Sequence, residues 1–211
     1  MKEKVTSSRK LDLEGFVGEF LAAQERDGPA YEPREDTFLM LDALSEQRLE
    51  GSRVLDMGTG SGILASYCAR RSADVTAADI DNGAIDSLRR VAKRLGIELK
   101  LVVSDLFSGI QGMFDLVVFN PPYLPSSSLD DRAVDGGEQG TRVIGRFLAQ
   151  LREHLTEDGL ALLLVSSLNN PEELVKSHAD LAFEPIHNRA LFFERLYVMK
   201  VKRRKSSVTQ Q

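Results

Sequence analysis

A short apolar segment that runs into three closely spaced glycines is the feature that most restricts how this chain can fold. The segment R-V-L-D-M-G-T-G-S-G-I-L covers residues 53–64 and predicts a buried strand ending at Asp56, a turn, and a helix from Ile63. The turn contains three glycines: Gly58, Gly60 and Gly62. A backbone that turns sharply from strand to helix needs positive φ angles, and a ligand lying on it needs residues without Cβ. The sequence therefore predicts a turn that cradles a ligand.

The glycine spacing separates this turn from other nucleotide-binding turns. A dinucleotide-binding turn has glycine at its first, third and sixth positions, whereas here Gly62 is the fifth and Ile63 the sixth. The chain has no G-x-x-x-x-G-K-[ST] phosphate loop. No glycine lies two residues before Ser61, so the turn is not the nucleophile elbow of a hydrolase. A tight strand–helix turn without a ligand stays open as the alternative.

Acidic residues end the next two predicted strands. Asp79 follows the apolar residues 75–78, about 20 residues after the first glycine, where a ribose-binding carboxylate is expected. Asp105 follows the strand predicted at 99–103. With Asp56, these carboxylates would share one edge of a parallel sheet, where Asp79 can accept from ribose hydroxyls and Asp105 from an adenine amine. The alternative is that these acids only cap helices or turns, as Asp79 or Asp81 could at the helix predicted from Asn82.

The fourth predicted strand, 114–119, leads directly into Asn120-Pro121-Pro122-Tyr123. Two prolines remove backbone donors and leave an environment rich in hydrogen-bond acceptors. Such a site suits a planar –NH₂ group, which can donate to the Asn120 side-chain oxygen and the Pro121 carbonyl while Tyr123 packs on its flat face. The alternative is an ordinary Asn-Pro turn.

Continuous apolar runs alternate with amphipathic helices from residue 53 onward, which predicts an α/β fold with a doubly wound, mostly parallel sheet. Two final strands, 182–186 and 191–201, are predicted to pair antiparallel at one edge, joined by a turn at 187–189. Before this region, residues 1–10 are polar and expected to be loose. A helix with an apolar stripe for core packing follows, carried by Leu13, Phe16, Val17, Phe20 and Leu21.

Composition excludes several classes of protein. The net charge of −5 and the pI near 5.3 argue against a general nucleic-acid or membrane-surface binder. A single cysteine, Cys68, excludes a disulfide scaffold and favours a reduced, cytoplasmic setting. The three histidines lack metal-ligand spacing, so no metal site is expected. No apolar run approaches 18 residues, which predicts a soluble protein.

Four motifs together resemble class I S-adenosylmethionine-dependent methyltransferases of the amino-methylating N-P-P-Y type: V-L-D-M-G-T-G-S-G, A-A-D-I-D, V-V-S-D-L-F and F-N-P-P-Y. The stretches Y-E-P-R-E-D-T-F-L-M-L-D-A-L at 31–44, D-G-G-E-Q-G-T-R-V-I at 135–144 and L-F-F-E-R-L at 191–196 are similar to the HemK-related branch of archaea and eukaryotes. Members of that branch methylate the side-chain amide of the glutamine in the G-G-Q loop of class 1 translation release factors. The resemblance covers residues 31–203 and implies a seven-stranded, Rossmann-like methyltransferase domain there. Residues 1–30 lie outside it and are expected to form a helical N-terminal extension, and residues 204–211 are expected to form a flexible tail.

The resemblance also implies roles for individual residues. With Gly60 of the glycine turn, the expected contacts to S-adenosylmethionine are Thr37, Asp56, Gly58, Asp79, Asp105, Leu106 and Asn120. The acceptor amide would be held by Asn120, Pro121, Pro122 and Tyr123, of which Asn120, Pro121 and Tyr123 would be catalytic. Asp56 stands where the family often has glutamate, and it keeps the carboxylate. The family further implies a small zinc-binding activator subunit that extends the sheet.

The sequence leaves three alternatives to glutamine methylation open. The N-P-P-Y signature also serves methylation of adenine or guanine amino groups, although the acidic pI and the lack of a second, substrate-recognising domain argue against it. Lysine methylation would require a base to deprotonate the ammonium, and no base is evident. A non-catalytic subunit of methyltransferase fold is the third, against which the intact motifs argue.

Overall fold

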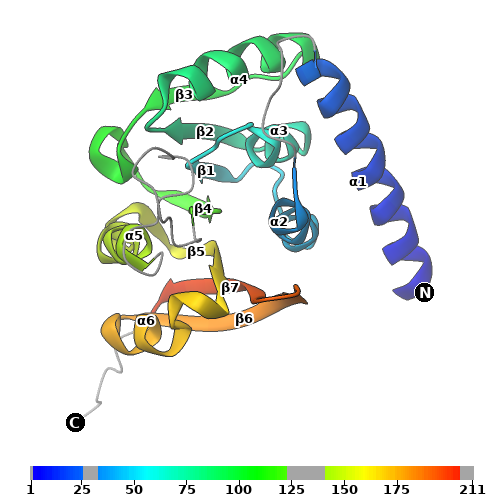
Figure 1. Cartoon of the computed structure of the whole chain (residues 1–211). Coiled ribbons are helices and arrows are strands. Elements are labelled where there is room, and N and C mark those ends of the chain that lie inside the picture. The colour runs from blue at the N-terminus through cyan, green and yellow to red at the C-terminus, as the bar shows by residue number, and fades with distance from the viewer. Residues whose placement is uncertain (1, 26–32, 123–140, 205–211) are drawn as a thin grey trace.

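The computed structural model describes residues 2–25, 33–122 and 141–204, with side chains from residue 12 onward. A seven-stranded sheet of order β3-β2-β1-β4-β5-β7-β6 has helices on both faces (Figure 1). The strands are β1 Arg53–Met57, β2 Asp74–Asp79, β3 Lys100–Val103, β4 Phe114–Phe119, β5 Leu155–Ser166, β6 Leu181–Ala190 and β7 Arg195–Arg203. The helical elements are α1 Lys2–Gln24, α2 Glu35–Ser45, α3 Ile63–Arg70, α4 Asn82–Leu95, α5 Thr141–His154 and α6 Pro171–Ser177, with 3-10 turns η2 Leu106–Gly109 and η4 Ser167–Asn169. The predicted doubly wound sheet is confirmed.

Neighbouring residues of each central strand enter two separate cores, because successive side chains of a strand point to opposite faces. In β4, Leu116 and Val118 pack with residues of α2, α3 and α4. Val117 and Phe119 pack with residues of α5 and α6 on the other face. Both faces are covered, which explains why these strands read as continuous apolar runs.

The last two strands close one edge of the sheet. β7 runs antiparallel to both β5 and β6, so the predicted antiparallel pair is confirmed. The predicted turn at 187–189 is wrong, because these residues stay in β6 and pair with β7. The register shifts between Pro185 and His187, which suits a proline that cannot donate to the ladder. The chain reverses instead at 191–194.

Helix α1 forms an outer layer over the helices of one face (Figure 1). It begins at Lys2, so the expectation of a loose segment at 1–10 is wrong for residues 2–10, while residue 1 lies outside the described residues. Its apolar stripe is core packing, as predicted: Phe20 is fully buried, and the Phe16 ring meets Tyr67 of α3 edge-on with centroids 5.3 Å apart. Arg94 of α4 donates a 2.8 Å hydrogen bond to the carbonyl of Ala23. Neither this helix nor any other in the described ranges has the length and apolar character needed to cross a membrane.

Candidate active site

The carboxyl ends of β2, β1 and β4 meet at one rim of the sheet. Met57 of β1 pairs with Ala78 on one side and Phe119 on the other. The residues that follow these three therefore come together at the rim: Gly58, Asp79 and Asn120. The strand order reverses between β1 and β4, and open α/β sheets bind their ligands at that point.

The glycine turn adopts the predicted backbone. Gly58, Gly60 and Gly62 have φ angles of 61°, 52° and 82°, a region that side chains disfavour. A Cβ on Gly62 would lie 2.2 Å from Leu88 of α4, whereas a Cβ on Gly60 would meet only a backbone oxygen at 4.0 Å. The close packing of α4 against the turn therefore requires glycine at position 62. At Gly60 the missing side chain leaves open space above the turn, where a ligand can approach the backbone.

Asp56 lies beneath this turn and is only 1% exposed. Its Oδ2 accepts a 2.6 Å hydrogen bond from the Thr59 hydroxyl and a 3.1 Å bond from the Ala65 N–H. Burial raises the pKa of the Asp56 carboxyl to about 7, because the two hydrogen bonds only partly replace lost hydration and the nearby charge of Asp79 opposes ionisation. A cationic group beside Asp56 would favour its ionised form.

Asp79 and Asp81 divide two tasks between them. Asp81 caps α4 by accepting from the Gly83 N–H at 2.8 Å. Asp79 instead lies at the rim, where its Oδ2 accepts a hydrogen bond from the Gly60 N–H at 2.8 Å and its Oδ1 accepts one from the Asp81 N–H at 2.9 Å. The capping alternative thus applies to Asp81. Asp79 is held at the mouth of the glycine turn.

Asp105 lies past the end of β3 and is exposed. Its Oδ2 forms a 2.8 Å ion pair with Arg146 of α5, a partner that the sequence did not indicate. The next residue, Leu106, has a positive φ of 49° and is buried. Apolar Ile80, next to Asp79, is 68% exposed. A flat apolar group between β2 and β3 would find Ile80 available for contact, and sequence reasoning missed this residue.

Asn120 is fixed by a residue from the other end of the domain. Its Nδ2 donates a 3.0 Å hydrogen bond to Oδ2 of Asp36, which lies in the first turn of α2 and is 4% exposed. The Asn120 Oδ1 is buried and has no hydrogen-bond partner among the described residues. A buried acceptor without a partner is costly, so this oxygen is available to a donor from a ligand or substrate.

Thr37 and Pro121 lie near this contact. Thr37 is buried, and its hydroxyl is 3.4 Å from Oδ1 of Asp36. Pro121 is buried and Pro122 partly so. Tyr123, the remaining predicted acceptor contact, lies outside the described residues. The structure thus brings Asp56, Gly58, Asp79 and Asn120 together at one rim. It adds Asp36, which the sequence analysis did not single out as a site residue.

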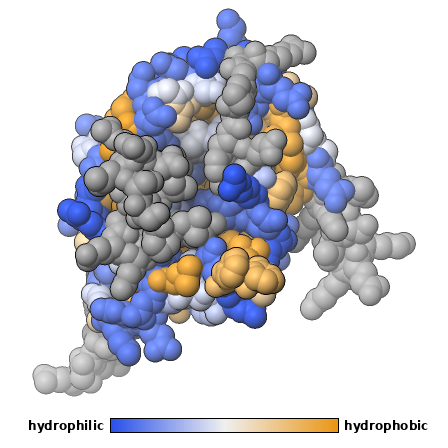
Figure 2. Space-filling model, viewed as in Figure 1, coloured by the Kyte–Doolittle hydropathy of each residue, from blue (hydrophilic) through white to orange (hydrophobic). Residues whose placement is uncertain are grey.

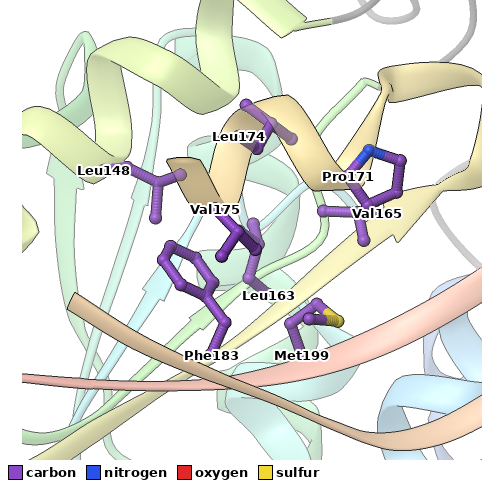
Figure 3. Close-up of a pocket in the computed structure, with 8 residues that line it drawn as sticks. All are labelled: Leu148, Leu163, Val165, Pro171, Leu174, Val175, Phe183 and Met199. Carbon is purple, nitrogen blue, oxygen red and sulfur yellow. The ribbon is translucent and has the colours of Figure 1, made fainter. Parts of the chain in front are cut away.

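A narrow crevice lies between α6 and the sheet (Figure 3), and none of the rim residues lines it. Its lining side chains are all apolar: Leu148, Leu163, Val165, Pro171, Leu174, Val175, Phe183 and Met199. With no polar group to orient a ligand, it is a packing seam of the core.

Comparison with known proteins gives consistent matches. The methyltransferase small domain model matches residues 34–182. A putative protein N5-glutamine methyltransferase of Methanocaldococcus jannaschii is 33% identical over 162 residues, which cover 73% of this chain and 81% of that protein. Methyltransferase HEMK2 of Mus musculus is 35% identical over 163 residues, covering 70% and 76%.

A solved structure gives the same relationship. The chain resembles a structure of the E. cuniculi Mtq2–Trm112 complex, described as responsible for methylating the translation termination factor eRF1. The TM-score is 0.68 at 32% identity, and the match covers 83% of this chain and 99% of the other. Helix α1 precedes the residues that the domain model matches.

Proposed function

Because this chain belongs to the methyltransferase small domain family, and within it to the HemK-related glutamine methyltransferases, we propose the following reaction. The enzyme transfers a methyl group from S-adenosylmethionine to the side-chain amide of the glutamine in the G-G-Q loop of a class 1 translation release factor. The observation that carries this proposal is the Asn120 amide, held by Asp36 with its buried oxygen left without a described partner.

The residues at the rim fit the cofactor. Asp56 lies beneath the turn, where its carboxylate can accept from the ammonium of the methionine moiety. Asp79 can accept from the ribose hydroxyls, and Asp105 from the adenine amine, as charge-assisted hydrogen bonds. The open space at Gly60 admits the ligand to the backbone. Thr37, Gly58 and Leu106 complete the proposed set of contacts.

S-adenosylmethionine supplies an electrophilic methyl group on its sulfonium. The protein must hold the acceptor nitrogen in line with that methyl. An amide nitrogen is a poor nucleophile because its lone pair is delocalised into the carbonyl. Hydrogen-bond acceptors around the –NH₂ group therefore carry most of the catalysis.

Asn120 Oδ1 and the Pro121 carbonyl are the proposed acceptors for the two hydrogens of the –NH₂ group. Pro122 and Tyr123 complete the acceptor site, Tyr123 by packing on the flat face of the amide. As positive charge develops on the nitrogen, a preorganised acceptor contributes about 3–4 kcal/mol, by analogy with oxyanion-hole donors. The proton leaves to water or a carbonyl after transfer, so the mechanism requires no general base.

An activator subunit is part of the proposal. The sheet has a free edge at β3, which pairs only with β2 in the part of the chain described. Val103 on this edge is 50% exposed. An unpaired edge strand with an exposed apolar side chain suits the addition of a strand from a partner. A zinc-binding subunit that extends the sheet at β3 would pair with the free edge of this strand and cover the Val103 side chain.

Methyl transfer from labelled S-adenosylmethionine tests the function directly. The acceptors are a purified G-G-Q-containing release factor, total tRNA and DNA, each with and without a candidate activator. Label on the release factor that disappears when its G-G-Q glutamine is replaced supports the proposal. Label on nucleic acid alone would overturn the proposed acceptor and leave the methyltransferase assignment intact.

The Asn120→Ala variant is the matched control for this assay. It should lose transfer while its cofactor affinity, measured by calorimetry, falls several-fold at most. Transfer at a near wild-type rate would contradict the role of Asn120.

A further inference from the structure

The turn between β6 and β7 carries the two most exposed of the large apolar side chains in the described ranges. Phe192 is 93% exposed and Phe193 is 86% exposed. Their rings meet edge to face, with centroids 4.7 Å apart. Figure 2 shows apolar surface where the end of this hairpin lies. Two adjacent phenylalanines in water favour contact with another molecule.

The turn is held firmly although its tip is exposed. The Leu191 N–H donates to the carbonyl of Glu194 at 2.8 Å. The Glu194 carboxylate accepts from the hydroxyl of Ser166, the last residue of β5. The Arg195 N–H donates to Ser167 Oγ at 3.0 Å. The two rings are therefore presented on a fixed support, which lowers the entropy lost when a partner binds.

The hairpin projects from the same rim as the active site. Leu196, at its base, pairs with Ser166, whereas Phe119, just before Asn120, pairs with Leu163. Ser166 therefore lies two residues beyond the level of Asn120, or about 7 Å along the strand direction. β7 is two strands from β4, or about 10 Å across the sheet. About four extended residues would span this distance.

We propose that Phe192 and Phe193 form a docking platform for the acceptor protein, contacting its surface beside the glutamine that enters the active site. This inference rests on the proposed function, since a macromolecular acceptor must have surface beyond the methylated loop. Leu168 of η4 is 44% exposed and follows the strand end on which the turn is anchored, so it extends the platform. The acceptor protein is the partner that binds the platform, because the platform lies at the same rim of the sheet as Asn120.

Steady-state methylation of the intact release factor tests the platform. The double variant Phe192→Ser/Phe193→Ser is compared with the wild type and with Met113→Ser. Met113 is 38% exposed and directly precedes β4, so it lies at the opposite rim of the sheet from Asn120, where the amino end of β4 begins. The double variant should raise KM for the protein acceptor at least about tenfold, as expected for buried aromatic anchors, with kcat and cofactor affinity within about twofold of wild type. Met113→Ser should leave KM unchanged.

A short peptide containing the G-G-Q sequence, with no residues that reach the hairpin, provides the second measurement. Wild type and double variant should methylate it with equal kcat/KM. If the double variant has the same KM for the protein acceptor as the wild type, the proposed platform is refuted. The proposed function would still stand in that case, because the wild type methylates the release factor. If the double variant instead abolishes a wild-type dimer in light scattering, or weakens activator binding, with the acceptor KM unchanged, the patch serves another partner. If the wild type labels no release factor, the proposed function itself fails.

Discussion

The Asn120 Nδ2 atom lies 3.0 Å from Oδ2 of Asp36, a contact between residues 84 positions apart. An asparagine amide can present either its oxygen or its NH₂ group to a ligand, and the two ends are similar in size. Because a carboxylate only accepts hydrogen bonds from N–H groups, Asp36 selects the orientation in which Oδ1 faces the substrate. The charge that directs the acceptor site therefore comes from helix α2.

Replacing Asp36 with alanine should lower kcat about 10- to 100-fold, the effect of losing one hydrogen bond to a charged group. The amide of Asn120 would then be free to turn and offer its NH₂ group to another NH₂ group. Steady-state methylation of the acceptor measures kcat, and calorimetry should show cofactor affinity within a fewfold of wild type. A parallel loss of cofactor affinity and melting temperature, with kcat retained, would show that Asp36 only stabilises the fold.

Exchanging the two side chains separates orientation from simple packing. Asn120→Asp alone places two carboxyl groups about 3 Å apart in a buried site, which disfavours ionisation of both. Adding Asp36→Asn restores a donor–acceptor pair, with the new amide at position 36 donating and the new carboxylate at position 120 presenting an oxygen. The double variant should therefore be at least about tenfold more active than Asn120→Asp, because contacting residues couple by up to about 3 kcal/mol. Additive losses in the double-mutant cycle would refute the orienting role.

The sequence predicted the parts of the site that follow from local rules. Strand ends at Asp56, Asp79 and Asn120 are visible because apolar runs stop at polar residues, and the glycine turn requires its glycines. Asp36 was missed because an acid in the first turn of a helix already has a local explanation. Its contact with Asn120 depends on how α2 packs on one face of the sheet, which no local pattern records.

The errors in the fold have the same origin. Residues 187–189 are polar and were predicted to turn, but β6 is an edge strand, so polar side chains are tolerated along it. Residues 2–10 lack an apolar stripe, but they continue a helix whose later turns are buried. Residues 187–189 form a strand because of their position at the edge of the sheet, and residues 2–10 are helical because they continue the helix that is buried further along.

The stability of the ligand-free protein should depend on pH through Asp56. Its carboxyl has a pKa of about 7 in the folded protein, against 3.8 as the ordinary value. Between about pH 4 and pH 7 the folded state keeps a proton that the unfolded chain has lost, so rising pH lowers the free energy of unfolding by up to about 1.4 kcal/mol per unit. Above about pH 7 both states are ionised and this dependence ends.

Urea unfolding at about pH 5 and pH 7 measures the effect. Asp56→Asn is the control, because its side-chain oxygen can still accept from Thr59 and Ala65 while it cannot ionise. The decrease in stability with pH should be smaller in this variant than in wild type. Equal decreases in the two proteins would mean that Asp56 is ionised throughout this range.

Gly62→Ala should destabilise the protein more than Gly60→Ala. Both glycines have positive φ angles, of 82° and 52°, so each substitution incurs backbone strain of about 1 kcal/mol. At Gly62 the new methyl group also meets Leu88 at 2.2 Å, and overpacking adds about 1–3 kcal/mol. Thermal and urea unfolding measure the difference. Shortening the obstructing side chain with Leu88→Ala should cost less stability in the Gly62→Ala background than in wild type. Equal costs of Leu88→Ala in both backgrounds would contradict the packing role of Gly62. Gly60→Ala, by contrast, should mainly weaken cofactor binding, because its methyl group projects into the space above the turn.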